Sequence, residues 1–382
     1  MTEPFLIIYL HHVQAISLSV AGTIIGSSGL AGVIAIPISG WLTTHIQTKR
    51  IFFLSVLLNA VGRFLFIFAA DVKTAFFASI LSGGAGAVLW NALSMILADS
   101  ADKTQTRSIF GTAFALQNLG SGIGAALGST IIHSNSAYSF KTIFILDACS
   151  FLLFSFFGQK WVENSRKKEL KGQIKRDKSI HSAASQCNNM IMLCFCYAVF
   201  AVVMTGLSTT LFPQWATENA QTPLRVVGHA FFLNSLMIVL GQPLILRLTA
   251  SIRSTRVISL AAFIFATGDF MILSASFLQA GWTSLVLILA FTISAIGENC
   301  LFSSLPALIN RLATDETRSS YNSAMNTAWQ IGSVLGPVIS GSYLSQGRAI
   351  LLFILFIGAL IILVFLLHIL EQIIPVDLNK GK

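Results

Sequence analysis

Four ionisable side chains stand deep inside long apolar stretches of the sequence: Arg63, Asp147, Asp269 and Glu298. A charged group at the centre of a bilayer costs about 2.5–3.5 kcal/mol on insertion scales, so each of these residues needs a partner or a function. Glu3, which precedes a shorter apolar stretch, is a fifth candidate. The chemistry open to such groups is proton binding, cation binding or charge pairing.

Depth within the apolar stretches predicts one charge pair. Arg63 lies about 12 residues into its stretch, or about 18 Å at the 1.5 Å rise per residue of a helix. Asp147 lies about seven residues into a stretch that runs in the opposite direction, which places it near the same level. Pairing is cheaper than burying either charge alone, and a carboxylate held by an arginine is a poor proton carrier. We therefore predict a structural ion pair, with a role in coupling as the alternative.

Glu298 has no obvious basic partner of this kind. The membrane interior favours the neutral form of an unpaired carboxyl group, and a proton carrier requires that property. We interpret Glu298 as a proton or cation site, and the alternative is a hydrogen-bonded structural acid. The same two alternatives apply to Asp269 and Glu3.

The composition indicates a membrane protein. Of the 382 residues, 54% are hydrophobic and 10% are charged, whereas soluble domains carry about 25% charged residues. Mean hydropathy is +0.77. Because lipid offers the backbone no hydrogen-bond partner, apolar runs of about 20 residues indicate helices rather than the shorter strands of a barrel. The five cysteines have no metal-ligand spacing, and the sequence contains neither a nucleotide-binding loop nor a hydrolytic Ser, His and Asp constellation. We therefore expect neither a metal site nor an enzyme.

Eleven stretches are long enough to cross a bilayer as helices. They lie at 17–43, 51–70, 75–98, 108–132, 141–159, 189–213, 224–249, 257–279, 284–309, 319–345 and 349–371. Residues 5–10 are apolar but too short to cross a hydrocarbon core about 30 Å thick. We interpret residues 1–12 as the outer half of a first helix whose beginning is absent, in an all-α polytopic membrane protein.

Basic residues gather on one side of the predicted spans. That side holds 19 of the 24 Lys and Arg residues, in segments 44–50, 99–107, 160–188, 247–256, 311–318 and the C-terminal tail. The other side holds Lys73, Lys141, Arg225 and Arg348. By the positive-inside rule, this asymmetry predicts a plasma-membrane (inner-membrane) protein whose central loop and C terminus are cytoplasmic. It also accounts for the net charge of +9 without any nucleic acid.

The two halves of the chain resemble each other. Residues 42–50 and 248–256 share the pattern Leu-Thr-x-x-Ile-x-x-x-Arg, and Pro37 and Pro243 have the same spacing. An even number of spans separates matching points, so the halves are parallel, which is the layout of one large transporter class. The predicted division is 1–160 and 189–372 for the helical halves, 161–188 for a basic cytoplasmic linker and 373–382 for a cytoplasmic tail. We expect the linker to lie on an anionic leaflet, with protein docking as the alternative.

The loop at 40–50 carries a family resemblance. Its sequence, Gly-Trp-Leu-Thr-Thr-His-Ile-Gln-Thr-Lys-Arg, resembles the Gly-x-Leu-Ala-Asp-Arg-x-Gly-Arg-Lys signature of the major facilitator superfamily. Thr44 stands in place of the signature's Asp, and His45 in place of its Arg. The resemblance covers essentially the whole chain and implies two six-helix halves. It also implies a cytoplasmic gate formed by Gly40, Lys49, Arg50, Asp99 and Arg107. For the last two residues, simple solvation of a helix end is the alternative.

The stretch 108–132 resembles the drug:proton antiporter branch of this family. The resemblance rests on the spacing of four glycines, which are Gly111, Gly120, Gly124 and Gly128. Ala125 replaces the proline of that branch. Glycines four residues apart also let helices approach closely, so helix packing is the alternative. The matching stretch in the second half contains Gly336 and Pro337, and this proline is expected to kink its helix.

Further resemblances concern the interior of the predicted bundle. Gly297-Glu298 is similar to a Gly-Glu pattern of proton-coupled multidrug exporters, whereas Ile80 stands where that group has a basic residue. The resemblance makes the spans of Arg63 and Asp147 neighbours. It also implies a cavity lined by aromatic and amide side chains, for which ordinary packing is the alternative. These are Trp90, Gln117, Asn118, Asn299, Asn326 and Trp329.

Together these resemblances imply a secondary active transporter that exports a small amphipathic molecule in exchange for protons by alternating access. Nutrient importers share the same fold, and a non-transporting sensor or decayed gene product is a third hypothesis. The expected partners are a small-molecule substrate and the lipid bilayer, without nucleic acid, and the chain is expected to be a monomer. No cofactor is expected, since the proton gradient is the energy source.

Overall fold

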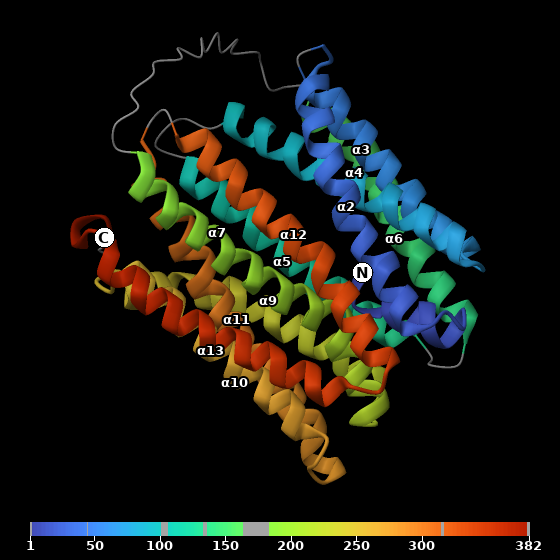
Figure 1. Ribbon diagram of the computed structural model, residues 1–382. Coiled ribbons are helices and arrows are strands. Elements are labelled where there is room, and N and C mark those ends of the chain that lie inside the picture. The colour runs from blue at the N-terminus through green and yellow to red at the C-terminus, as the bar shows by residue number, and fades with distance from the viewer. Residues whose placement is uncertain are drawn as a thin grey trace.

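The computed structural model is all-helical over the residues that it describes, which are 2–43, 45–100, 106–132, 136–162, 183–314 and 317–379 (Figure 1). The first half contains α2 (Leu18–Leu42), α3 (Thr48–Leu65), α4 (Val72–Ser100), α5 (Thr106–Ile131) and α6 (Ala137–Val162). The second half contains α7 (Ala183–Gly206), α9 (Leu224–Thr249), α10 (Ser254–Ala275), α11 (Ala280–Leu312), α12 (Arg318–Ser345) and α13 (Ala349–Ile373). Short helical segments continue three of these helices: η3 (Phe66–Phe68) follows α3, α14 (Val376–Asn379) follows α13, and η4 (Leu207–Leu211), α8 (Phe212–Gln214) and η5 (Trp215–Asn219) follow α7.

Each of the eleven predicted spans corresponds to one of these helices, so the predicted all-α membrane fold is confirmed. Within the described residues, nine helical stretches are long and apolar enough to cross a membrane. α5 and α12 are 26 and 28 residues long but less apolar, because Gly, Ser and Asn take many of their positions. Small residues suit a surface on which another helix packs closely.

The short apolar segment at the start is also helical. It consists of η1 (Glu3–Phe5), α1 (Leu6–Ile8) and η2 (Tyr9–Val13), and residues 5–10 are all buried. The Tyr9 hydroxyl donates a hydrogen bond to the Phe66 carbonyl oxygen at 2.8 Å. Ala15 then adopts a positive φ of 53°, and the chain continues into α2. This first segment (residues 2–13) therefore belongs to the core of the bundle.

The predicted linker and tail are only partly described. Residues 163–182, most of the 161–188 linker, lie outside the described part of the chain, and α7 begins at Ala183, inside the predicted linker. In the predicted tail, Asn379 is buried and fastened to the start of α10. Its Oδ1 accepts a hydrogen bond from the Thr255 backbone N–H at 3.1 Å, and its Nδ2 donates to the Thr255 hydroxyl at 2.9 Å.

Two helix pairs join the halves of the bundle. α2 packs along α12, and α5 packs along α9 more extensively than along α4 or α6 of its own half. We call the membrane face on which α2, α9 and α11 end the basic face, and the other the opposite face. In Figure 1, α2 and α12 lie together near residues 18 and 345 and diverge toward their other ends, at the basic face.

The contacts between the halves are closest near the opposite face. A Cβ added to Gly22 of α2 would lie 3.0 Å from the Gly341 Cα of α12. A Cβ added to Gly228 of α9 would lie 2.8 Å from the Ala125 carbonyl oxygen of α5. At the other end of α2, Gly40 has no atom within 4 Å of such a Cβ. Backbone therefore packs on backbone at the opposite face, and α2 is free of this close packing at the basic face.

Candidate functional site

The two charges predicted to pair lie together inside the first half. Arg63 Nε on α3 is 3.8 Å from Asp147 Oδ2 on α6. The Thr2 hydroxyl joins them: it donates to Asp147 Oδ2 at 2.7 Å and accepts from an Arg63 guanidinium nitrogen at 2.9 Å. Thr2 and Asp147 are both buried. The pair thus holds α3, α6 and the first segment together. The role of Thr2 could not be predicted from the sequence because hydroxyl side chains occur throughout the chain.

Glu298 is held from a neighbouring helix. Asn234 Nδ2 on α9 donates to Glu298 Oε1 on α11 at 3.1 Å and to the Phe291 carbonyl oxygen at 3.0 Å. Asn234 is 6% exposed. Within the described residues, Asn234 supplies the one hydrogen bond to the Glu298 side chain and no cation pairs with it. The carboxyl group is therefore oriented by a neutral donor.

An aromatic cluster begins one helical turn from Glu298. Phe302 follows at i+4, on the same face of α11. Its ring centroid lies 5.5 Å from that of Trp329 on α12 and 6.3 Å from that of Phe114 on α5. Trp329 also contacts Tyr197 of α7, with ring centroids 5.3 Å apart. Four helices from both halves thus bring aromatic rings to one place beside the carboxyl group.

Other predicted residues lie at the depth of this cluster. Phe302 stands ten residues from the end of α11, and Trp90 ten residues from the end of α4, both about 15 Å from the basic face. Gln117 stands eleven residues from the start of α5, or about 16 Å. Trp90 is 39% exposed, and Gln117 and Asn326 are exposed. We call this set the mid-span belt: Trp90, Phe114, Gln117, Tyr197, Phe302, Asn326 and Trp329.

Two of the predicted site residues, the acid Asp269 and the cavity candidate Asn299, are enclosed by packing. Asp269 on α10 is fully buried, and neither carboxyl oxygen has a hydrogen-bond partner. Its neighbour Gly268 packs against Ser294 of α11, so this side of α10 is covered. Asn299 is 4% exposed and donates to the Met237 and Ile238 carbonyl oxygens at 3.4 and 3.3 Å. Both side chains point into helix contacts because small residues bring those helices close.

The remaining cavity candidates stand apart from Glu298. Asn118 is half-buried and donates to the Phe114 carbonyl oxygen of its own helix at 2.9 Å. Glu3 is exposed, next to Thr2 and therefore at the level of the Arg63–Asp147 pair.

The predicted gate lies at the end of the bundle where α2 is not closely packed. Arg50 is exposed and Lys49 is half-buried at the start of α3. Gly40 faces open space. The side chains of Asp99 and Arg107, and the whole of Thr44, lie outside the described part of the structure.

The predicted glycine spacing coincides only in part with the contacts between helices. A Cβ on Gly336 would lie 2.6 Å from the Gly206 backbone nitrogen of α7, and Pro337 is buried in α12. Gly120, by contrast, has no atom within 4 Å of such a Cβ, so it does not serve packing. A Cβ added to Gly122, which the predicted spacing omits, would lie 2.6 Å from the Ser235 Cβ of α9. Gly124 and Gly128 lie within α5, half-buried and buried respectively, and Gly111 lies where side-chain surroundings are not described.

A contact between two histidines and a glutamate at the opposite face was not among the predicted pairs. His12 Nε2 lies 3.1 Å from Glu218 Oε1, and His11 Nε2 lies 3.8 Å from the same oxygen. Both histidines belong to η2, and Glu218 belongs to η5 at the end of the α7 span. We call these three residues the latch. The latch connects the first segment to the second half of the chain. In the sequence, the two adjacent histidines at the end of an apolar stretch were the one feature that could have predicted this contact.

Comparison with known proteins identifies the family of this chain. The sequence model of the Major Facilitator Superfamily matches residues 1–211 and 193–373. The chain belongs to this superfamily. The two matches overlap at residues 193–211 and together cover almost the whole chain, and superfamily membership makes the protein an integral membrane transporter.

Two bacterial relatives of this superfamily match most of the chain. The MFS-type transporter YttB of Bacillus subtilis (strain 168) is 24% identical over 342 residues, which cover 88% of this chain and 82% of YttB. The MFS-type transporter YdeE of Escherichia coli (strain K12) is 25% identical over 350 residues, which cover 90% of this chain and 85% of YdeE.

Solved transporter structures share the fold at low sequence identity. A peptide transporter POT in complex with sulfate has a TM-score of 0.80 at 16% identity, covering 99% of this chain and 92% of that one. A point mutant of the nucleoside transporter NupG has a TM-score of 0.72 at 12% identity, covering 97% of this chain and 96% of that one. These likenesses concern the fold alone.

Proposed function

We propose that this protein is a proton-coupled exporter of small amphipathic molecules, in the drug:proton antiporter branch of the superfamily. The observation that carries the proposal is the position of Glu298: its carboxyl group stands one helical turn from an aromatic cluster drawn from four helices, with a neutral amide as its partner. A carboxyl group without a paired cation can take up and release a proton in the membrane interior. The Arg63–Asp147 pair is a structural element in this scheme.

The mid-span belt supports an amphipathic, aromatic or cationic substrate. Aromatic rings contribute large apolar contact areas, and their faces attract cations within about 6 Å. Gln117 and Asn326 add amide groups that can hydrogen-bond a polar substituent. Substrate bound against Phe302 would stand one turn from Glu298, so a proton and a cationic substrate would compete for the same negative charge.

The packing between the halves supports transport by alternating access. The structure is closely packed at the opposite face, through Gly22 with Gly341 and Gly228 with Ala125, and this suits loading from the basic face. We take the basic face as cytoplasmic and the membrane as the plasma membrane, by the positive-inside rule. Rocking of one half against the other would separate these contacts and the latch, and expose the site on the outer side.

The proton gradient is the proposed energy source. One proton that moves inward releases about 2.3 kcal/mol for each 100 mV of transmembrane potential. In one-for-one exchange, this free energy corresponds to about 50-fold accumulation of a neutral substrate. Ile80 occupies the position where the exporters resembled have a basic residue, so Glu298 would act here without that partner.

The test is transport in inverted membrane vesicles with an imposed pH gradient and the aromatic cation ethidium as the probe. We expect ethidium uptake that requires the gradient and is lost in Glu298→Gln. The matched control is Asp71→Asn, at the opposite face, where hydrogen bonds from Thr74 lower the pKa of the Asp71 carboxyl. Asparagine keeps the N-cap that Asp71 provides, so this variant should transport normally. Uptake without a gradient, or unchanged uptake in Glu298→Gln, would contradict proton coupling, and uptake in the reverse orientation would indicate an importer.

A further inference from the structure

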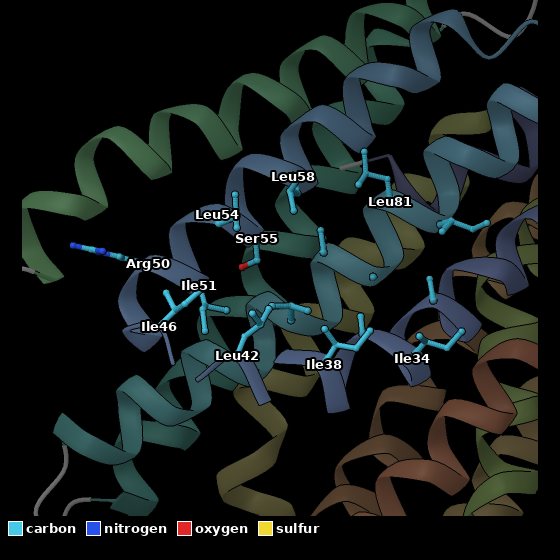
Figure 2. A pocket seen from close by; sticks show the side chains of 16 residues that line it. Ile34, Ile38, Leu42, Ile46, Arg50, Ile51, Leu54, Ser55, Leu58 and Leu81 are labelled. Atoms are coloured by element: carbon cyan, nitrogen blue, oxygen red, sulfur yellow. The ribbon is translucent and has the colours of Figure 1, made fainter. Parts of the chain in front are cut away.

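A groove with a volume of about 490 Å³ runs between α2 and α3, with α4 as its floor (Figure 2). It lies away from Glu298 and the aromatic cluster, which involve α5, α7, α9, α11 and α12. Its lining residues are Ala31, Ile34, Ala35, Ile38, Leu42, Ile46, Arg50, Ile51, Leu54, Ser55, Leu58, Ile80, Leu81, Gly84, Ala85 and Val88. The proposed transport function leaves this groove without a role.

The wall of the groove is apolar along its whole length. Apart from Arg50, Ser55 is the one polar side chain in the lining, and its hydroxyl donates to the Phe52 carbonyl oxygen at 2.7 Å. That donor is therefore satisfied, and the lining helices satisfy their own backbone groups. Ile34 and Leu54 are 57% and 54% exposed on the two sides of the groove. Such a surface favours an alkyl chain over a polar or charged molecule, which would lose its hydrogen bonds to water.

The two walls of the groove, on α2 and α3, match one leaflet of a bilayer in length. The lining positions on α3 run from 50 to 58 and those on α4 from 80 to 88, or about 12 Å along each helix. Those on α2 run from 31 to 42, or about 16 Å. Half of a hydrocarbon core about 30 Å thick is about 15 Å. On α2 and α3 the groove therefore extends from the basic face to about the middle of the membrane, and the α4 positions that form its floor lie deeper, about 18–30 Å from the basic end of that helix.

A positive charge stands at the open end of the groove. The Arg50 side chain projects away from the apolar lining at the start of α3 (Figure 2). It is exposed, and no ion pair with Arg50 occurs in the described ranges. The sequence contains no acidic residue between Glu3 and Asp71, so α2 and α3 offer Arg50 no carboxylate. An anionic group from outside the protein would supply Arg50 with a partner of opposite charge at this end of the groove.

We propose that this groove binds one phospholipid with an anionic headgroup from the leaflet on the basic face. One acyl chain lies between α2 and α3, and the lipid phosphate lies at Arg50, which is the fork-shaped donor best suited to phosphate. Basic side chains at this depth attract anionic lipids at membrane surfaces. The site is separate from the proposed transport site, so each can fail without the other.

Native mass spectrometry of the full-length, delipidated protein tests this proposal. The probes are palmitoyl-oleoyl phosphatidylglycerol, which is anionic, and palmitoyl-oleoyl phosphatidylcholine, which has the same chains and no net charge. We expect one phosphatidylglycerol to be retained in preference to phosphatidylcholine. Arg50→Gln should weaken that preference about fivefold, the usual contribution of one basic side chain near a membrane surface. Ala35→Phe should fill the groove and abolish the bound lipid altogether.

Two matched variants control for charge and for bulk. Arg348→Gln removes an arginine at the opposite face, and Gly358→Phe adds a ring on α13 where the space is open. Both should keep the wild-type preference. Ala35→Leu is a milder filling variant, for use if Ala35→Phe fails to fold. Equal retention of both lipids by the wild type would overturn the proposal, as would a bound phosphatidylglycerol that survives both filling variants. Displacement of the lipid by ethidium would also overturn it, since the groove would then be a substrate site.

Discussion

Asn234 Nδ2 lies 3.1 Å from Glu298 Oε1 and 3.0 Å from the Phe291 carbonyl oxygen, so one amide group orients the carboxyl group and crosslinks α9 to α11. Asn234 is thus a positioning residue for Glu298. Asn299 crosslinks the same two helices through the Met237 and Ile238 carbonyl oxygens and does not contact Glu298. The two asparagines therefore separate the structural contribution of this helix contact from its effect on coupling.

Asn234→Ala should reduce gradient-driven ethidium uptake several-fold, because the carboxyl group loses its oriented donor, worth about 1 kcal/mol. The concentration of ethidium that gives half-maximal uptake should change little, since the aromatic cluster remains. Asn299→Ala removes a comparable hydrogen bond and should lower thermal stability equally while the uptake rate per folded molecule is kept. Equal losses of uptake in the two variants would show that Asn234 is merely structural.

Loss of the latch should raise the population of the conformation that is open at the opposite face. His12 and Glu218 are each 38% exposed at the side chain, so solvent screening limits their pairing to about 1 kcal/mol at most. Glu218→Gln should therefore shift the population toward an open opposite face by about fivefold or less. Spin labels at Ser19 on α2 and Gln346, which follows α12, would report the change as a longer distance. Asp71→Asn at the same face should leave the distance distribution unchanged, and a latch variant that behaves like it would exclude this role.

Bulk at the contact between Gly22 of α2 and Gly341 of α12 should prevent closure of the opposite face. Gly22→Ala places a Cβ 3.0 Å from the Gly341 Cα, and backbone on both sides leaves no flexible group to yield. Overpacking of this kind costs about 1–3 kcal/mol, and uptake should fall at least several-fold. Gly281→Ala, at the start of α11 where the space is open, is the control and should transport normally. Full activity in Gly22→Ala would mean that this contact is not needed in the transport cycle.

The Arg63–Asp147 pair should behave as a structural element. Asp147→Leu leaves a half-buried cation without its carboxylate and should lower the free energy of unfolding by up to about 3–5 kcal/mol. The double variant Arg63→Leu/Asp147→Leu removes both charges and should recover most of that loss, together with gradient-driven uptake. Denaturant unfolding in detergent and vesicle uptake measure the two effects. A stable double variant without coupled transport would instead assign the pair to coupling.

Depth in the membrane could be predicted from the sequence, because a helix rises by a constant 1.5 Å per residue across a slab of known thickness. That regularity alone places Arg63 and Asp147 at one level, and their side chains lie 3.8 Å apart. The same arithmetic places Glu298 far from water, and the apolar runs predict the eleven spans.

The direction in which each side chain points around its helix axis, and the helices that lie next to it, depended on tertiary packing. Apolar residues surround a membrane helix on all sides, so periodicity cannot separate a cavity face from a packed face. Asp269, a candidate proton or cation site, and Asn299, a cavity candidate, are both enclosed, whereas Gly120, for which helix packing was the alternative, faces open space. The Asn234 amide at Glu298, the Thr2 hydroxyl between two charges and the latch each join segments far apart in the chain. Such contacts exist only once helices lie side by side, because hydrogen bonds and ion pairs act over about 3–4 Å.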